Sequence, residues 1–299
     1  MSYLYIVIAD ILLGIMFLLN KKYQSIKGAS LKSGLKTNFS IGLIGFITMF
    51  IVNGFTLNFS WYSFCIAIIT NTASAIYTIL GLKILRDGKV SIYSVFLMTG
   101  GMVLPFLYGV IFNSEKLSVL RVVGLVVMIL AIILINYDKV KPTKKQIIIS
   151  LAVFFLNGLL SIFSKIHQST PHLAVDTKSF VIIGSSLKFV ICFIVYLFVA
   201  KFSKRDAISI NNNECVLANK KQGLIAFIIL IGMGVVNTSS YLFQLIGAID
   251  VPATVLYPLI SGGSILITTL LGIFFYKEKH SKLSILGIIL SVIGTCAFI

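Results

Sequence analysis

Two charged side chains interrupt apolar runs that are long enough to cross a membrane. Asp10 lies in the run 3–20, and Lys188 lies in the run 178–200. A charge inside hydrocarbon costs on the order of 2.5–3.5 kcal/mol even on lenient insertion scales, so each residue is a candidate for function. If the two meet, they neutralise each other and could bind a polar ligand or relay protons. The alternatives are a structural ion pair, or a Lys188 stem that extends to water.

Uncharged polar side chains form two matched stripes on the runs 61–84 and 223–247. Positions i, i+3 and i+7 share one helical face, and in both runs they are polar: Asn71, Ser74 and Thr78 in the first, Asn237, Ser240 and Gln244 in the second. An amide that faces lipid would lack a hydrogen-bond partner, so both faces must point inward. They could line a water-accessible cavity or bond to a neighbouring helix. Interhelical bonds average only about 0.6 kcal/mol, which favours the cavity.

Aromatic residues and one further amide lie near these faces. Each tyrosine offers a flat apolar wall with a polar tip. The expected substrate-binding residues are Asn71, Ser74, Asn237, Ser240 and Gln244 for hydrogen bonds, Tyr77, Tyr241 and Tyr257 for stacking, Asn157 as a further contact, and Lys188 for an anionic group. Asp10 is expected to couple transport to protons or to bind an amino group. No catalytic residues are expected.

The elements that must position these residues are membrane helices. The chain is 58% hydrophobic and only 11% charged, whereas soluble domains are about 25% charged. Its apolar residues occur in ten runs, most of them near the ~20 residues that span a bilayer: 3–20, 37–55, 61–84, 90–112, 117–136, 146–165, 178–200, 223–247, 251–276 and 281–299. They do not alternate as barrel strands do. The fold class is therefore an all-α integral membrane protein with ten transmembrane helices.

The basic charge of the chain fits a membrane protein rather than a nucleic-acid binder. Of 25 Lys and Arg residues, 20 fall in the loops after the first, third, fifth, seventh and ninth runs. The opposite loops hold four, namely Lys116, Arg121, Lys165 and Lys178. Such a bias places the basic loops in the cytoplasm and both termini outside it, and the charge is expected to meet anionic lipid headgroups.

Metal, redox and catalytic sites are not expected. Cys65, Cys192, Cys215 and Cys296 lack metal-ligand or redox spacing. The three histidines lie in or beside loops, and no nucleophile has a base at a fixed spacing. The protein is therefore expected to be no enzyme and to need no cofactor or metal.

The second half of the chain repeats the first. Three motifs return: Glu115-Lys116-x-Ser118-x-Leu120-x-x-x-Gly124 as Glu278-Lys279-x-Ser281-x-Leu283-x-x-x-Gly287, Asn71-Thr72-x-Ser74 as Asn237-Thr238-x-Ser240, and Gly14 with Lys21 as Gly158 with Lys165. A basic cluster near Tyr137–Lys145 separates two repeats, 1–140 and 141–299. An odd number of spans in each repeat turns one upside down relative to the other, as in carriers that open alternately to the two sides of a membrane. Glu115 and Glu278 are expected to cap the helices that follow them.

The ten runs and the doubled Glu-Lys-x-Ser-x-Leu-x-x-x-Gly motif resemble the drug/metabolite transporter superfamily, EamA type. The resemblance covers the whole chain. It implies two inverted five-helix repeats and a central cavity lined by the first to fourth and sixth to ninth helices. Members move amino acids, other metabolites, nucleotide sugars or toxic cations, often with proton coupling.

Two residues bear on the substrate that this resemblance implies. In the small four-helix relatives an acidic residue in the first helix exchanges protons for cationic drugs, and Asp10 resembles that position. Lys188 departs from the pattern, because a cation in the bundle favours a carboxylate or a phosphate. Members are usually drawn with cytoplasmic termini, whereas the Lys/Arg bias predicts the reverse.

We therefore expect a secondary active transporter in the plasma membrane that moves a small polar or amphipathic metabolite, an organic anion or zwitterion, by alternating access. Its partners are the small-molecule substrate, protons as the coupling ion and membrane lipids. A proton-coupled multidrug or toxic-cation exporter is the nearest alternative, followed by a passive channel or a non-transporting scaffold. The sequence leaves open the substrate, the coupling ion, the direction of transport and the oligomeric state, a homodimer included.

Overall fold

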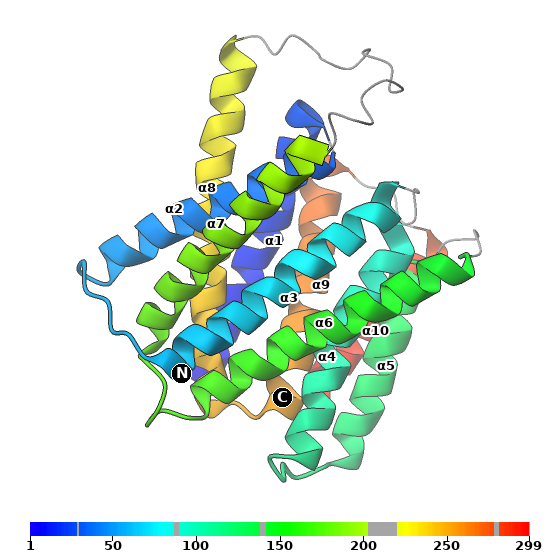
Figure 1. Cartoon of the computed structure of the whole chain (residues 1–299). Helices are drawn as coiled ribbons and strands as arrows, with labels where there is room; N and C mark the ends of the chain where they lie inside the picture. Colours follow the sequence, from blue (N-terminus) through cyan, green and yellow to red (C-terminus); the bar gives the residue numbers. More distant parts are fainter. Residues whose placement is uncertain (29, 87–89, 138–141, 203–219, 278–280, 299) are drawn as a thin grey trace.

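In a computed structural model the protein is a bundle of α-helices (Figure 1). The structure describes residues 1–28, 30–86, 90–137, 142–202, 220–277 and 281–298. Within these ranges ten helices follow one another: α1 (Ser2–Lys27), α2 (Leu31–Val52), α3 (Trp61–Arg86), α4 (Val90–Ile111), α5 (Val119–Ile135), α6 (Lys144–Gln168), α7 (Thr177–Phe202), α8 (Lys220–Asp250), α9 (Ala253–Tyr276) and α10 (Lys282–Cys296). Each predicted run coincides with one helix, so the all-α prediction is confirmed.

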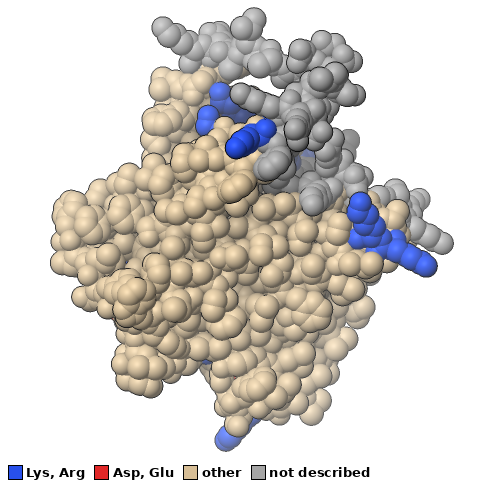
Figure 2. Space-filling model, in the orientation of Figure 1, with Lys and Arg blue, Asp and Glu red and all other residues tan. Residues whose placement is uncertain are grey.

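Eight of the helices are long and apolar enough to cross a membrane, as in a multi-pass membrane protein. The other two, α5 and α10, are apolar but have only 17 and 15 residues, fewer than the ~20 that a 30 Å core requires. Large apolar side chains cover the outside of the bundle, Phe227 among them at 59% exposed. In Figure 2 the sides of the bundle are tan, and the visible Lys and Arg side chains lie near its ends.

Local signals in the sequence explain where several helices begin. The Ser30 side chain accepts a hydrogen bond from the Ser33 amide at the start of α2. The Ser281 side chain accepts one from the Ser284 amide at the start of α10. Thr143 and Gln146 form a reciprocal capping box at the start of α6. These bonds satisfy amide groups that the first helical turn leaves without partners.

The helices of the two halves pack in corresponding pairs. The α1 helix packs on α8 and α9, and α6 packs correspondingly on α3 and α4. In addition, α2 packs on α7, α4 on α9 and α5 on α10. If five is added to each helix number, and numbers above ten are reduced by ten, every pair becomes a pair of the same set. Helices at equivalent places in the two halves therefore have equivalent neighbours.

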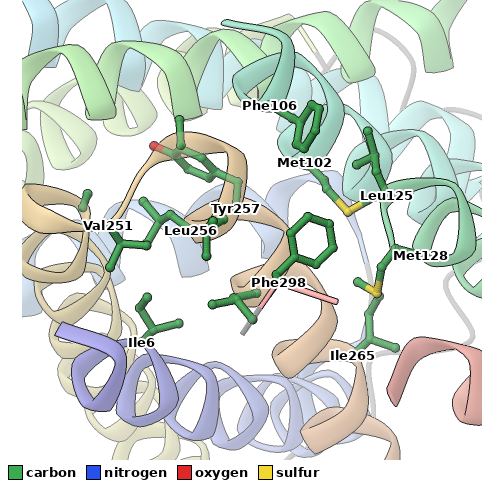
Figure 3. Close-up of a cluster of buried hydrophobic side chains, with 14 of the residues drawn as sticks. Ile6, Met102, Phe106, Leu125, Met128, Val251, Leu256, Tyr257, Ile265 and Phe298 are labelled. Atoms are coloured by element: carbon green, nitrogen blue, oxygen red, sulfur yellow. The ribbon is translucent and has the colours of Figure 1, made fainter. Parts of the chain in front are cut away.

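An apolar core joins α1, α4, α5, α8, α9 and the C-terminal end of the chain. Met128 and Leu125 of α5 lie beside Met102 and Phe106 of α4 in this core, and Tyr257 contributes its ring from α9 (Figure 3). Met102 and Met128 are fully buried. This packing holds α5 and α10 at one side of the bundle and leaves the other eight helices around the cavity described below.

Candidate binding cavity

A cavity of about 350 Å³ lies among eight helices, α1–α4 and α6–α9. It is lined by all ten residues that the sequence suggested for substrate binding: Asn71, Ser74, Tyr77, Asn157, Lys188, Asn237, Ser240, Tyr241, Gln244 and Tyr257. The lining comes from the helices that the family resemblance implied. The cavity is within the size range of small-molecule sites in proteins.

Lys188 extends from α7 into the cavity and meets an amide from α8. Its Nζ donates to Asn237 Oδ1 at 3.5 Å, a long hydrogen bond. The Lys188 side chain is partly buried and lines the cavity. Gly184, one turn earlier on α7, has no side chain, and a Cβ there would meet the Asn71 amide of α3. The two polar stripes thus reach the cavity on either side of α7.

The stripe on α3 is held mainly by its own helix. Asn71 Nδ2 donates to the Ala67 carbonyl at 2.8 Å, and Ser74 Oγ donates to the Tyr77 hydroxyl at 3.5 Å. Bonds within one helix fix the rotamers without tying the stripe to a neighbouring helix. Asn71 and Ser74 can therefore present further polar atoms to the cavity.

The stripe on α8 combines packing with cavity lining. Ser240 is fully buried and donates to the Ala9 carbonyl of α1 at 2.8 Å. Gln244 Nε2 donates to Ser240 Oγ at 3.3 Å. Ser240 thus joins two helices, while Gln244 and Asn237 remain the residues of this stripe best placed to meet a ligand. Both alternatives that the sequence left open apply to this stripe: Ser240 bonds to a neighbouring helix, and Asn237 and Gln244 line the cavity.

Polar contacts among α4, α6 and α9 form another wall. Asn157 Nδ2 of α6 donates to the Leu97 carbonyl of α4 at 2.7 Å. Ser161 lies one turn further along α6, and its carbonyl accepts a hydrogen bond from the Tyr257 hydroxyl. Tyr257 therefore bridges α9 to α6 at the edge of the cavity instead of presenting a free hydroxyl to it.

Asp10 does not line the cavity. It is 4% exposed and faces α9, where a Cβ on Gly263 would overlap its carboxylate. Its Oδ1 is buried without a hydrogen-bond partner, whereas Lys188 bonds to Asn237. The suggested meeting of Asp10 and Lys188 is therefore not realised. Asp10 lies between α1 and α9, whereas Lys188 extends from α7 to Asn237 of α8.

The end of the bundle where α6 and α8 end and α9 begins is held by charged side chains; we name it the Lys165 end. Lys165 is 5% exposed, and its Nζ donates to the carbonyls of Ala248 at 2.5 Å and Val251 at 2.8 Å. The sequence had suggested a loop position, but the lysine lies within α6 and satisfies carbonyls at the end of α8. A cation is favourable at the C-terminal end of a helix, where the last carbonyls lack partners within the helix.

Glu115 holds the start of α9 at the same end. It accepts hydrogen bonds from the amides of Ala253 and Thr254, both at 2.9 Å, and from the Thr254 hydroxyl at 2.7 Å. The expectation that Glu115 caps the next helix is wrong, because Ser118 caps α5. Burial alone would raise the pKa of the Glu115 carboxyl, but the hydrogen bonds outweigh it and lower the pKa below its ordinary value. Glu278, its repeat counterpart, lies outside the described residues.

Sequence reasoning missed several small polar residues of the cavity. Their hydroxyls come from α3, α6, α7, α8 and α9: Thr70, Ser161, Ser185, Thr238, Ser261 and Ser264. Ser161 could have been found, because it lies four residues after Asn157 and so shares its face. Within the described ranges no group of three or more His, Cys, Asp or Glu residues could hold a metal ion.

No family model and no curated protein sequence matches this chain. A solved structure described only as "Crystal structure of protein" matches 99% of this chain with 95% of its own, at a TM-score of 0.73 and 15% sequence identity. At this identity the likeness supports the fold alone.

Proposed function

We propose that this protein is a secondary active transporter that carries a small polar or amphipathic metabolite, an organic anion or zwitterion, by alternating access. The observation that carries the proposal is the cavity near the middle of the spans, lined from both halves of the chain. Polar groups inside a membrane bundle are costly and mark ligand or ion pathways. A cavity of this size with polar walls favours a ligand-binding function over a structural scaffold.

Contacts between α5 and α10 support two repeats related by a twofold axis. Ser291 Oγ lies 4.0 Å from Met128 Sδ, and the two positions differ by 163, the offset of the repeated Glu-Lys motif. Residues that sit at equivalent positions can meet in this way only near an axis.

Reciprocal contacts between α5 and α10 also support the twofold axis. A Cβ on Gly124 would approach the Gly294 carbonyl, and a Cβ on Gly287 would approach the Ala131 carbonyl. Adding 163 to Gly124, and subtracting it from Gly294, converts the first contact into the second. We propose that α5 and α10 also cross the membrane, which gives five spans in each half; such an axis then lies in the membrane plane, the arrangement of inverted-repeat carriers. We accordingly propose membership of the drug/metabolite transporter superfamily, EamA type, and a place in the plasma membrane.

Contacts between the cavity and the Lys165 end support a state closed at that end. Tyr257 donates to the Ser161 carbonyl, and the hydroxyls of Tyr241 and Ser164 are 3.1 Å apart. Beyond them Lys165 ties α6 to the end of α8. These bonds join helices of the second half to one another, and breaking them would separate α6 from α8 and α9. Alternating access requires such a set of contacts at one end that can form and break.

A thermal-shift screen of the purified protein tests this function. The panel holds amino acids, nucleobases, organic phosphates and lipophilic cations. A ligand at about 100 times its dissociation constant stabilises the folded state by about 2.7 kcal/mol, which is measurable. We expect at least one metabolite to raise the Tm of the wild type and not that of Asn71→Leu. A panel without any stabilising compound, or stabilisation that Asn71→Leu retains, contradicts a binding function for the cavity.

A proton-coupled exporter of cations is the second candidate, and Asp10 favours it. The buried Oδ1 of Asp10 without a partner is the kind of group that takes up a proton. This function predicts stabilisation by lipophilic cations only, lost in Asp10→Asn and kept in Lys188→Met. The metabolite carrier instead predicts stabilisation by anionic or zwitterionic metabolites, kept in Asp10→Asn and lost in Lys188→Met.

A further inference from the structure

The charges around the cavity are unequal. Lys188 lines it, whereas the lining holds no aspartate or glutamate among the residues that the structure describes. All other described polar residues of the lining are hydroxyls or amides, which are neutral and bind either sign weakly. The described lining therefore contains one basic side chain and no acidic side chain to pair with it.

The acidic residues that the structure describes lie away from the cavity. The sequence has nine, of which the structure describes four, and each of these has a place away from the cavity: Asp10 against Gly263, Glu115 at the start of α9, Asp176 with Asn58 and Ser179, and Asp250 with Ser2. The other five, at positions 87, 138, 206, 214 and 278, lie outside the described residues.

Lys188 itself has only a weak internal partner. The 3.5 Å hydrogen bond to Asn237 Oδ1 is at the limit of such bonds. An amide oxygen compensates part of an ammonium charge, and a carboxylate at a shorter distance would compensate far more. Lys188 lines the cavity, so a ligand that enters would lie beside this side chain.

The remainder of the cavity suits a neutral body. Leu97, Met98 and Phe17 give it apolar walls, and Asn71 and Gln244 offer amides. A ligand with a cationic group would place that group near Lys188 without an acid to receive it. Like charges in a site of low dielectric repel strongly. The same reasoning disfavours a zwitterion, because its ammonium would find only neutral acceptors.

We propose that the cavity selects compact organic monoanions, with a carboxylate bound at Lys188 and a neutral remainder against the amides and apolar walls. Cations and zwitterions of the same shape are rejected. This inference rests on the proposed function, in that it takes the cavity to be the substrate site, and it narrows the substrate from anion or zwitterion to anion.

Matched compounds test the proposal on the full-length protein. Three scaffolds, propyl, cyclohexyl and phenyl, each carry a carboxylate, a carboxamide, an aminomethyl group or an α-amino acid group. Binding is measured at neutral pH in detergent by calorimetry. We expect at least one scaffold in which the carboxylate binds about tenfold or more tightly than the carboxamide, aminomethyl and amino acid forms, the order of a charge-assisted hydrogen bond.

Variants assign the preference to Lys188. Lys188→Met should remove the advantage of the carboxylate over the carboxamide, and Lys188→Arg should retain most of it. The comparison among compounds on the wild type stands alone even if Lys188→Met does not fold. Tighter binding of an aminomethyl or amino acid form, equal binding of carboxylate and carboxamide, or a preference that persists in Lys188→Met overturns the proposal.

Failure of this inference is distinguishable from failure of the proposed function. Saturable binding of aminomethyl compounds that Asn71→Leu abolishes would overturn anion selection and leave the cavity as a binding site. If none of the twelve compounds binds the wild type, anion selection is overturned, and the wider metabolite screen then decides whether the cavity binds ligands at all.

Discussion

Replacing Glu115 by Gln should loosen the start of α9. The carboxylate accepts three hydrogen bonds there, at 2.9, 2.9 and 2.7 Å. Three bonds to a charged acceptor at about 1.5–3 kcal/mol each would be an upper limit, but the side chain is half-buried and water can replace part of them. The loss of a helix N-terminal cap, at about 0.5–2 kcal/mol, is the better guide. Gln keeps one acceptor oxygen, so we expect a loss of about 1–2 kcal/mol.

The effect of Glu115→Gln should depend on pH in a defined direction. The pKa of Glu115 is lowered in the folded protein from its ordinary 4.5. A carboxyl group with a lower pKa when folded stabilises the fold above its unfolded pKa, and the contribution is lost as the pH falls through the folded pKa. The difference between wild type and Glu115→Gln should therefore be full at neutral pH and shrink once the pH falls below 4.5.

Thermal unfolding in detergent, followed by circular dichroism, measures this difference. A change of 1 kcal/mol corresponds to a Tm shift of about 2–4 °C for a chain of this order of size. Lys116→Gln, a neighbouring exposed charge in the same loop, is the matched control and should leave the Tm unchanged. The reasoning is refuted if Glu115→Gln unfolds with the wild type at neutral pH, or if its deficit stays the same in acid.

Two further predictions concern close packing and coupling. Gly100→Ala should cost about 1–3 kcal/mol, because its Cβ would overlap the Phe154 backbone of α6; Gly223→Ala, which meets nothing within 4 Å, should be neutral or stabilising by up to ~1 kcal/mol in the same unfolding assay. Equal effects of the two alanines would refute the close approach of α4 and α6. Asp10→Asn should leave ligand affinity in detergent unchanged, since Asp10 does not line the cavity, and abolish the acceleration of uptake by a pH gradient in proteoliposomes. Persistence of that acceleration would remove Asp10 from the coupling mechanism.

The helices and the polar stripes could be predicted from the sequence for one physical reason. Hydrocarbon requires long apolar helices and turns polar side chains inward, so composition alone located α3 and α8 and the inward faces of Asn71 and Asn237. Repetition of the motifs added the correspondence of the two halves. The candidate cavity residues followed from these two facts together.

Contacts between distant segments could not be predicted in the same way. The sequence places Glu115 just before α5, and only the fold brings the start of α9 to it. Lys165 resembles a loop lysine because its cation follows an apolar run, yet the α8 carbonyls make its burial tolerable. Asp10 and Lys188 each interrupt an apolar run, yet only Lys188 lines the cavity. Asp10 shares a helical face with Leu13 and Phe17, which do line it, but lies nearer the start of α1 and against Gly263 of α9. These outcomes depend on which distant segments pack against one another, which no local pattern specifies.

The most direct test of the proposed transport is to measure whether the cavity can be labelled from each side of the membrane. Ser261→Cys, a size-conserving change in the cavity wall, is introduced into a chain whose native cysteines are replaced. Glu115→Cys and Thr254→Cys, from the contact at the Lys165 end, are joined first as a disulfide by a mild oxidant, each thiol losing a proton and an electron to it, which leaves the separate thiol at position 261 free to react. We predict that an impermeant maleimide labels position 261 from both sides of the membrane without the cross-link, and from one side only with it. Labelling from a single side without the cross-link, from both sides with it, or from neither side would contradict alternating access.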